Sequence, residues 1–283
     1  MERIGVVGCG IMGAGIAEVA ARGQLSVTVH EVDDGAVAAG RERIARSLRR
    51  AVASGKLSQV ENDETLERIV FTTELAELAD RQLIVEAIVE DEAAKIDLFG
   101  RLDKVADEEA ILASNTSSIP IMKLARATGR ADRVVGLHFF NPVPVLRLVE
   151  LVNSLLTSDQ TVAAVSELAE KRLDRHVIHS KDRAGFIVNA LLIPYILSAI
   201  RMLESGFASA EDIDLGMVEG CAHPMGPLAL ADLIGIDTTE AVAESLYEEF
   251  KEPLYAPPPL LLRMREAGLL GRKTGQGFYS YPG

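Results

Sequence analysis

Residues 3–31 read RIGVVGCGIMGAGIAEVAARGQLSVTVHE, and this stretch decides the fold class. It opens with a short apolar run at 3–8 that is typical of a buried strand, and a GxGxxG motif follows directly. The next residues have helical periodicity, and a second apolar run at 26–30 ends at the acidic Glu31. The motif alone is weak, but a strand before it, a helix after it and an acid about 20 residues later predict a dinucleotide-binding βαβ unit.

The glycine loop indicates how a dinucleotide would bind. Glycines allow a tight turn and a close backbone approach, so a pyrophosphate can rest on the N-terminus of the following helix. The residues expected to line it are Gly8, Gly10, Ile11, Met12 and Gly13. Glu31 would accept hydrogen bonds from the adenosine ribose and, with Asp33 and Asp34, would repel a 2′-phosphate, which favours NAD. The alternative is a glycine-rich turn that holds no ligand.

Strand and helix patterns alternate beyond this unit. Further strands are expected at 69–72, 83–88, 111–114 and 176–179, and the helical segments between them at 36–53, 74–79, 90–105 and 159–173. Repeated βα winding predicts a Rossmann-type doubly wound, mostly parallel sheet with ligands at the carboxyl ends of its strands. From residue 186 to the tail the pattern predicts helices only, at 186–204, after a capping box at 209–212, at 229–250 and at 259–267. We therefore predict a Rossmann-type α/β domain over 1–183 and a smaller all-α domain over 184–283.

The stretch VVGLHFFNPVPVLRLVELV at 134–152 predicts a catalytic site. His138 ends one apolar run, Glu150 lies inside the next, and the prolines between them force a turn. A carboxylate is costly to bury unless it is paired, and an imidazole is the obvious partner. Such a carboxylate fixes the histidine tautomer and stabilises the imidazolium of a general acid/base. By itself the stretch is also compatible with a strand-end histidine and a glutamate that reaches solvent.

The composition limits the partners and the compartment. The 283 residues carry 29 Lys and Arg against 42 Asp and Glu, a net charge of −13, which argues against general binding of nucleic acid or anionic membranes. With only two cysteines we expect no disulfide framework and a cytoplasmic location. The opening MERIGVVGCG does not fit a signal peptide, and the longest uncharged run, 184–200, is shorter than the roughly 20 residues that span a bilayer. No Cys/His/Asp spacing predicts a metal site.

A basic cluster stands out in this acidic chain. Arg43, Arg46 and Arg50 share one face of the second expected helix, at spacings of i, i+3 and i+7. Arg49 and Lys56 lie close by in the sequence. Such a cluster fits a highly phosphorylated substrate, and a solvated helix face is the alternative.

Polar residues gather where two further strands are expected to end. Glu86 and Glu90 bracket the end of the strand in LIVEAIVE, and Lys95 lies in the helix after it. The run SNTSS at 114–118 closes the following strand. A helix cap ahead of Pro120 would explain one or two of its hydroxyl side chains. Five small hydrogen-bonding residues in a row at a strand's carboxyl end favour a site.

The segment FIVNALLIPYILSAI at 186–200 is apolar nearly all round its predicted helix. More than one face must therefore be covered, and a homodimer formed through the helical domain would cover one of them. Asn189 is the exception in this helix. A buried amide needs partners, which could be a neighbouring helix or a substrate.

Several motifs together occur in the order and at the spacing of a known family. They are GxGxxG, SNTSS, HFFNP followed by LVELV, GFIVN, HPMGPL and the tail GRKTGQGFY. Along essentially its whole length the sequence resembles the L-3-hydroxyacyl-CoA dehydrogenase family, and within it the bacterial 3-hydroxybutyryl-CoA dehydrogenases. The resemblance implies an NAD-dependent oxidoreductase that interconverts a short-chain (S)-3-hydroxyacyl-CoA and the 3-ketoacyl-CoA.

The resemblance also implies roles for individual residues. His138 matches the catalytic base and Glu150 the carboxylate that orients it, while Ser117 and Asn189 match contacts to the substrate oxygen. Asn141 matches a motif position that we interpret as close behind the substrate. The positions that match dinucleotide contacts are Glu90, Lys95, Asn115 and Lys273. For coenzyme A, Ser47 fits a family contact, but Ser54 stands where a lysine would be, so the basic contact would come from Arg46, Arg49, Arg50 or Lys56.

Two other interpretations stay open at this point. A dehydrogenase of a free β-hydroxy acid would share both domains, but such enzymes typically rely on a lysine base, and the helix at 186–200 has none. A non-catalytic, crystallin-like dinucleotide-binding protein is the second. The complete set of Ser117, His138, Glu150 and Asn189 argues against it.

Overall fold

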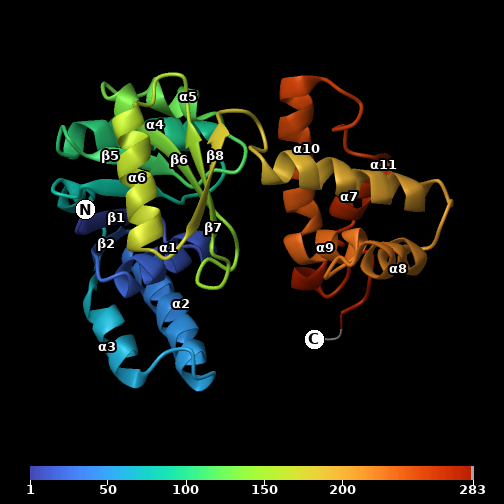
Figure 1. The fold of residues 1–283 in the computed structure, drawn as a ribbon, viewed down its shortest axis with the longest axis horizontal. Helices are drawn as coiled ribbons and strands as arrows, with labels where there is room; N and C mark the ends of the chain where they lie inside the picture. Colours follow the sequence, from blue (N-terminus) through green and yellow to red (C-terminus); the bar gives the residue numbers. More distant parts are fainter. Residues whose placement is uncertain (282–283) are drawn as a thin grey trace. The chain divides into compact units, whose positions relative to one another are not determined.

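The protein is described here by a computed structural model, which covers residues 1–281 (Figure 1). The chain divides into two compact units, Met1–Asp182 and a second that begins at Arg183. The first unit has a sheet with helices on both faces and the second is helical, so the predicted fold class is confirmed.

The first unit is built on an eight-stranded sheet in the order β3-β2-β1-β4-β5-β6-β7-β8. Neighbouring strands are parallel except for the antiparallel β6/β7 pair. The strands are β1 (Arg3–Val7), β2 (Ser26–His30), β3 (Ile69–Thr72), β4 (Leu83–Glu86), β5 (Ile111–Ser114), β6 (Val134–Phe139), β7 (Leu148–Asn153) and β8 (His176–Lys181). The strand order reverses at β1 and β4, and doubly wound sheets bind ligands at such a switch point.

This unit has six α-helices. They are α1 (Ile11–Arg22), α2 (Asp34–Ala53), α3 (Gln59–Glu67), α4 (Glu92–Val105), α5 (Ile121–Ala125) and α6 (Asp159–Lys171). Asp33 caps α2 by accepting from the Ala36 N–H at 2.7 Å. Helix α3 was not predicted, because its residues QVENDETLE lack an apolar period; a capping box of Ser58 and Glu61 starts it.

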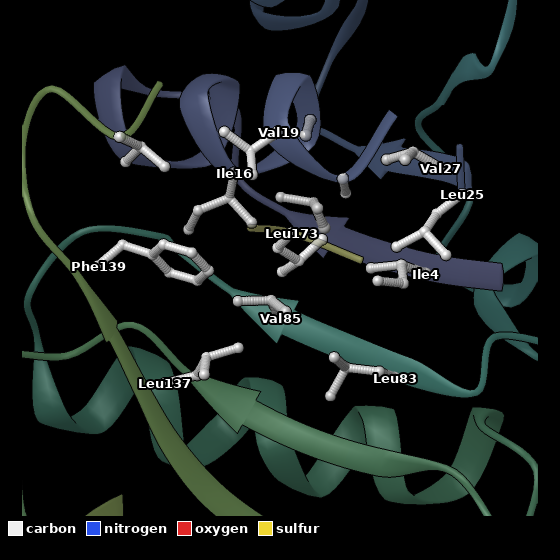
Figure 2. Close-up of a cluster of buried hydrophobic side chains, with 14 of the residues drawn as sticks. Ile4, Ile16, Val19, Leu25, Val27, Leu83, Val85, Leu137, Phe139 and Leu173 are labelled. Carbon is white, nitrogen blue, oxygen red and sulfur yellow. The ribbon is translucent and has the colours of Figure 1, made fainter. Parts of the chain in front are cut away.

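One part of the first unit's core lies between α1 and the sheet. Figure 2 shows Ile16 and Val19 of α1 pointing toward Val85 and Phe139, which come from the strands below. All four side chains are buried. This packing fixes the start of α1, and with it the glycine loop, against the carboxyl ends of β1 and β4.

The second unit packs five helices around an apolar core of its own. They are α7 (Val188–Glu204), α8 (Ala210–Cys221), α9 (Pro227–Ile234), α10 (Ile236–Phe250) and α11 (Pro259–Glu266). The prediction of a single helix over 229–250 is wrong. Gly235 adopts a φ of 105° and separates α9 from α10, a conformation that glycine reaches at no steric cost.

Candidate active site

The loop between β1 and α1 contains three glycines of the motif. At two of them a side chain would collide with the backbone of the chain itself, and at the third it would not. A Cβ on Gly13 would lie 1.8 Å from the carbonyl oxygen of Gly8, and a Cβ on Gly8 would lie 2.8 Å from that of Ala87. A Cβ on Gly10, which precedes α1, would meet nothing within 4 Å. The backbone at Gly10 is therefore open to a ligand, at the helix end where N–H groups favour an anion.

The residues around this opening fit the remaining parts of a dinucleotide. Large apolar side chains are exposed directly after three neighbouring strands: Ile11 after β1, Val32 after β2 and Val89 after β4. Exposed aliphatic groups at the carboxyl edge of a sheet offer surfaces on which adenine and nicotinamide rings can lie. Together with the open glycine backbone they offer apolar and anion-binding groups of the kind that NAD needs.

Two charged side chains form hydrogen bonds with the backbone of Cys9, which lies in the glycine loop. The carboxylate of Glu31 accepts a hydrogen bond from the Cys9 N–H at 2.5 Å, and the guanidinium of Arg43 donates to the Cys9 carbonyl at 3.0 Å. The Arg43 side chain, which comes from α2, therefore contacts the glycine loop. It does not join Arg46 and Arg50 in the exposed basic face predicted from the sequence. Burial raises the pKa of the Cys9 thiol to about 12, so this thiol stays neutral and unreactive.

Glu31 should decide between NAD and NADP. We expect NADH to be used far better than NADPH, because the Glu31 carboxylate would face a 2′-phosphate at short range. Glu31→Ala should lower the ratio of kcat/KM for NADH to kcat/KM for NADPH by about tenfold, which is equivalent to about 1.4 kcal/mol. Equal kcat/KM values for NADH and NADPH in the unaltered enzyme would contradict the assignment of Glu31.

The buried Glu86 and Lys95 and the partly exposed Glu90 form a charged group at the end of β4. The Lys95 ammonium, from α4, lies 2.7 Å from Glu86 and 2.9 Å from Glu90. Glu86 also accepts from the Ser114 hydroxyl at 2.6 Å and from the Ile88 N–H at 2.7 Å. Lys95 is only 1% exposed, and its predicted role at the dinucleotide stays a prediction.

Glu90 connects this charged group to the SNTSS loop. One of its oxygens accepts from the Thr116 hydroxyl, from the Ser117 N–H at 3.1 Å and from the Ser118 hydroxyl at 3.1 Å. Burial acts to raise the pKa of Glu90, but the Lys95 ammonium and the Thr116 hydroxyl outweigh it and lower that pKa. The loop thus has an ionised carboxylate at its centre near neutral pH.

The predicted pairing of His138 with Glu150 is present in the structure. Strands β6 and β7 are antiparallel with His138 opposite Glu150, and the Nδ1 atom lies 2.7 Å from a carboxylate oxygen. Glu150 is 0% exposed and His138 is buried as well. The alternative of a solvent-facing glutamate is therefore excluded. A buried carboxylate at Nδ1 accepts the N–H of the neutral imidazole there, which leaves Nε2 as the nitrogen that can take up and return a proton.

Neighbouring residues hold the end of β6 in place. The side-chain oxygen of Asn115, directly after β5, accepts from the Phe139 N–H at 2.9 Å. The Phe140 ring lies 4.5 Å from the imidazole of His138, centroid to centroid. Asn141 is exposed and begins the turn that leads to β7. Asn115 thus fixes the backbone next to His138, which sequence spacing did not reveal.

Two predicted site residues belong to the second unit. Asn189 is the second residue of α7 and is half-buried. Lys273 lies in the tail, where its ammonium pairs with Asp237 of α10 at 2.5 Å. The roles of both residues stay predictions.

The basic residues of α2 fall into two groups. Arg49 pairs with Glu42 at 2.7 Å, so its charge is largely compensated. Arg46, Arg50 and Lys56 are exposed and form no ion pair with any residue in 1–281. Arg46 and Arg50 of α2 and Lys56 just after it therefore carry positive charge that no ion pair compensates within residues 1–281.

The fold and this edge of the sheet define an NAD-dependent dehydrogenase of the Rossmann class with a helical second domain. Residues 3–183 match the family model described as "3-hydroxyacyl-CoA dehydrogenase, NAD binding domain", and residues 185–281 match its "C-terminal domain". The chain belongs to the 3-hydroxyacyl-CoA dehydrogenase family. It is an NAD-dependent oxidoreductase.

Individual relatives agree with this assignment. A 3-hydroxybutyryl-CoA dehydrogenase of Mycobacterium tuberculosis is 57% identical over 282 residues, which cover 99% of each chain. The crystal structure of M. tuberculosis FadB2 superimposes with a TM-score of 0.99 at 57% identity, covering 100% of this chain and 99% of that one. The (S)-3-hydroxybutyryl-CoA dehydrogenase PaaH1 of Ralstonia eutropha has a TM-score of 0.96 at 46% identity, with 100% of both chains covered.

Proposed function

We propose that the chain interconverts (S)-3-hydroxybutyryl-CoA and acetoacetyl-CoA with NAD(H), and that His138 is the general acid/base. The buried contact between His138 and Glu150 carries this proposal, because it supplies an oriented imidazole at the same sheet edge as the dinucleotide loop. The names of the relatives support the substrate class.

The chemistry follows from these groups. NAD supplies the hydride acceptor, so the protein must supply only proton transfer, orientation and electrostatic stabilisation. In oxidation, Nε2 of His138 takes the hydroxyl proton as the hydride leaves the same carbon, and Glu150 stabilises the imidazolium that forms. In reduction, the imidazolium returns the proton to the substrate oxygen. Ser117 and Asn189 would donate hydrogen bonds to that oxygen, where negative charge develops.

Activity along a series of acyl chains tests the substrate proposal. Steady-state reduction of 3-ketoacyl-CoA thioesters, from four-carbon to palmitoyl length, should give the highest kcat/KM for acetoacetyl-CoA. A maximum at the long-chain end would reject the short-chain assignment while keeping the enzyme in its family. Free acetoacetate should be a poor substrate, which separates this proposal from a β-hydroxy-acid dehydrogenase.

We also propose that the uncompensated cations of α2 bind the phosphates of coenzyme A. The protein's net charge of −13 repels a polyanionic ligand, so a local positive field must offset it. Arg46, Arg50 and Lys56 provide such a field, while Ser47 and Arg49 lie on the same helix as weaker contacts. A solvated helix face is the competing interpretation.

Replacing Arg46 and Arg50 together by glutamine should raise the KM for acetoacetyl-CoA by about tenfold, since charge-assisted phosphate contacts contribute about 1.5 to 3 kcal/mol each and less when exposed. The KM for NADH should barely change, and the effect should shrink at high salt. Arg49→Gln serves as a comparison and should raise that KM less, because Glu42 already compensates the charge of Arg49. An unchanged KM for the thioester at low salt would show that the face is merely solvated.

We further propose a homodimer formed through the second unit. That unit exposes large apolar side chains on several helices and loops: Ile187, Leu191, Phe207, Leu215 and Leu233. Large exposed apolar side chains of this kind favour a protein–protein interface. Light scattering should give about twice the chain mass of 30.5 kDa, and the monomer mass alone would contradict the proposal.

We infer a cytoplasmic location from the cysteines. Cys9 is buried and Cys221 is exposed, and both are free thiols, as expected in a reducing compartment. In the described part of the chain, no helix has the length and apolar character to cross a bilayer. Fractionation of cells that express the tagged chain would test the location.

A further inference from the structure

Arg43 is a half-buried cation that the proposed mechanism does not use. Its guanidinium donates to the Cys9 carbonyl, in the glycine loop, at 3.0 Å. Within residues 1–281 it forms no ion pair. A guanidinium has five N–H donors in a fixed fork, so Arg43 keeps donors for a further acceptor beside the loop. Phosphate oxygens suit that fork especially well.

The Glu31 carboxylate is bonded to the same loop residue. Its Oε1 accepts from the Cys9 N–H at 2.5 Å, and its Oε2 accepts from the Val32 N–H at 3.2 Å. Cys9 thus has an anion bonded to its N–H and a cation bonded to its carbonyl. No ion pair joins Glu31 to Arg43, so neither charge cancels the other by direct contact. A ligand group beside Cys9 therefore interacts with both charges.

We propose that the glycine loop contains a latent site for the 2′-phosphate of NADP(H), in which Arg43 is the cation and Glu31 closes the site. The inference rests on the proposed contact between Glu31 and the adenosine ribose. A ribose held there would present a 2′-phosphate to the carboxylate first, and an arginine nearby is the group that accepts this phosphate in Rossmann folds that bind NADP. Repulsion by Glu31 masks the attraction of Arg43, and removal of the carboxylate should reveal it.

The other charged residues near the start of α2 do not replace Arg43 in this role. Asp33 and Asp34 add negative charge, but Asp33 accepts from a backbone N–H of α2 at 2.7 Å and is compensated by the helix N-terminus. Arg41 lies two residues before Arg43, so their side chains leave the helix in different directions. The Arg41 guanidinium lies over the Phe71 ring, 4.4 Å from its centroid. Arg41 is therefore a matched control for Arg43.

The test is the affinity for both cofactors without substrate, measured by isothermal titration. Glu31→Ala should lower the ratio of the Kd for NADPH to the Kd for NADH. Adding Arg43→Met should raise that ratio again by about tenfold or more, on the scale of a charge-assisted phosphate contact. Adding Arg41→Met instead should leave the ratio of Glu31→Ala unchanged, and adding Arg43→Lys, which keeps the charge, should retain part of the gain. The ratio corrects for any disturbance of the glycine loop that affects both cofactors.

Phosphorus NMR gives a second readout of the same contact. The 2′-phosphate resonance of NADPH should shift when the nucleotide binds Glu31→Ala, and it should shift less with the Glu31→Ala/Arg43→Met double variant at saturation. An unchanged Kd ratio on adding Arg43→Met would overturn the proposal, and so would an equal effect of Arg41→Met. If the unaltered enzyme binds NADPH as well as NADH and Arg43→Met removes only the binding of NADPH, the role of Glu31 fails and the phosphate site at Arg43 is supported. Because no thioester is present, failure to reduce acetoacetyl-CoA would not change these outcomes.

Discussion

His138→Gln should lower kcat for acetoacetyl-CoA reduction by about 100-fold or more, because a positioned acid/base typically contributes about 10² to 10⁴ in rate. Glutamine keeps a polar side chain of similar reach but cannot exchange a proton near neutral pH. The Kd for NADH should stay nearly constant, since the glycine loop and Glu31 are untouched. Stopped-flow measurement of NADH oxidation under single-turnover conditions isolates the chemical step.

A histidine elsewhere in the same sheet provides the control for this experiment. His179 is exposed on β8, opposite Leu151 and therefore next to Glu150 in the ladder. His179→Gln changes the same residue type by the same substitution and should leave the single-turnover rate intact. Near-normal turnover of His138→Gln would remove His138 from the mechanism.

Glu150→Gln should have the second-largest effect, a fall in kcat of about 10- to 100-fold, because the carboxylate orients the imidazole and stabilises its charged form. Glutamine fits the same buried space, and removing a buried charge lowers the cost of desolvation, so the fold should persist. Reduction needs the imidazolium. Glutamine offers the imidazolium no charged partner, so the pH profile of the reduction rate should shift.

The pH profile distinguishes catalysis from structure at Glu150. A purely structural role predicts a lower melting temperature and a lower rate at every pH, with the profile unshifted. A shifted profile at a normal melting temperature supports the electrostatic role. Both measurements use the same purified variant and the unaltered enzyme as reference.

Local sequence patterns were sufficient for most of the first unit. The glycine motif with its flanking strands predicts the βαβ unit, because the period of apolar residues and the φ preferences of glycine act within a few residues. The same reasoning failed where a pattern was missing or ambiguous. Helix α3 has no apolar face, and Gly235 was interpreted as an internal helical residue although it ends α9.

The candidate site was predictable only where two residues share a hairpin. His138 and Glu150 oppose each other because a short turn joins antiparallel strands, and the sequence shows both the turn and the buried acid. The contacts of Arg43 with Cys9 and of Asn115 with Phe139 join segments that are far apart in the chain. Only the strand order brings them together, and no spacing rule encodes it.

Glu86 is a partial exception among the missed residues. Glu86 lies at the end of the apolar run LIVE, and a buried acid needs a partner. A cation or a hydroxyl group was therefore to be expected near it. Lys95 was visible one and a half turns into the next helix. What the sequence did not reveal is that both side chains are almost fully buried.

The most direct test of the function is the rate of NADH oxidation with acetoacetyl-CoA, measured beside free acetoacetate at equal concentration. We expect rapid turnover of the thioester, with kcat in the range of about 1 to 10³ s⁻¹ that enzymes typically reach, and little or none with the free acid. His138→Gln, measured in the same assay, should lose that activity. No turnover of the thioester by the unaltered enzyme, or equal turnover of both compounds, would contradict the function proposed here.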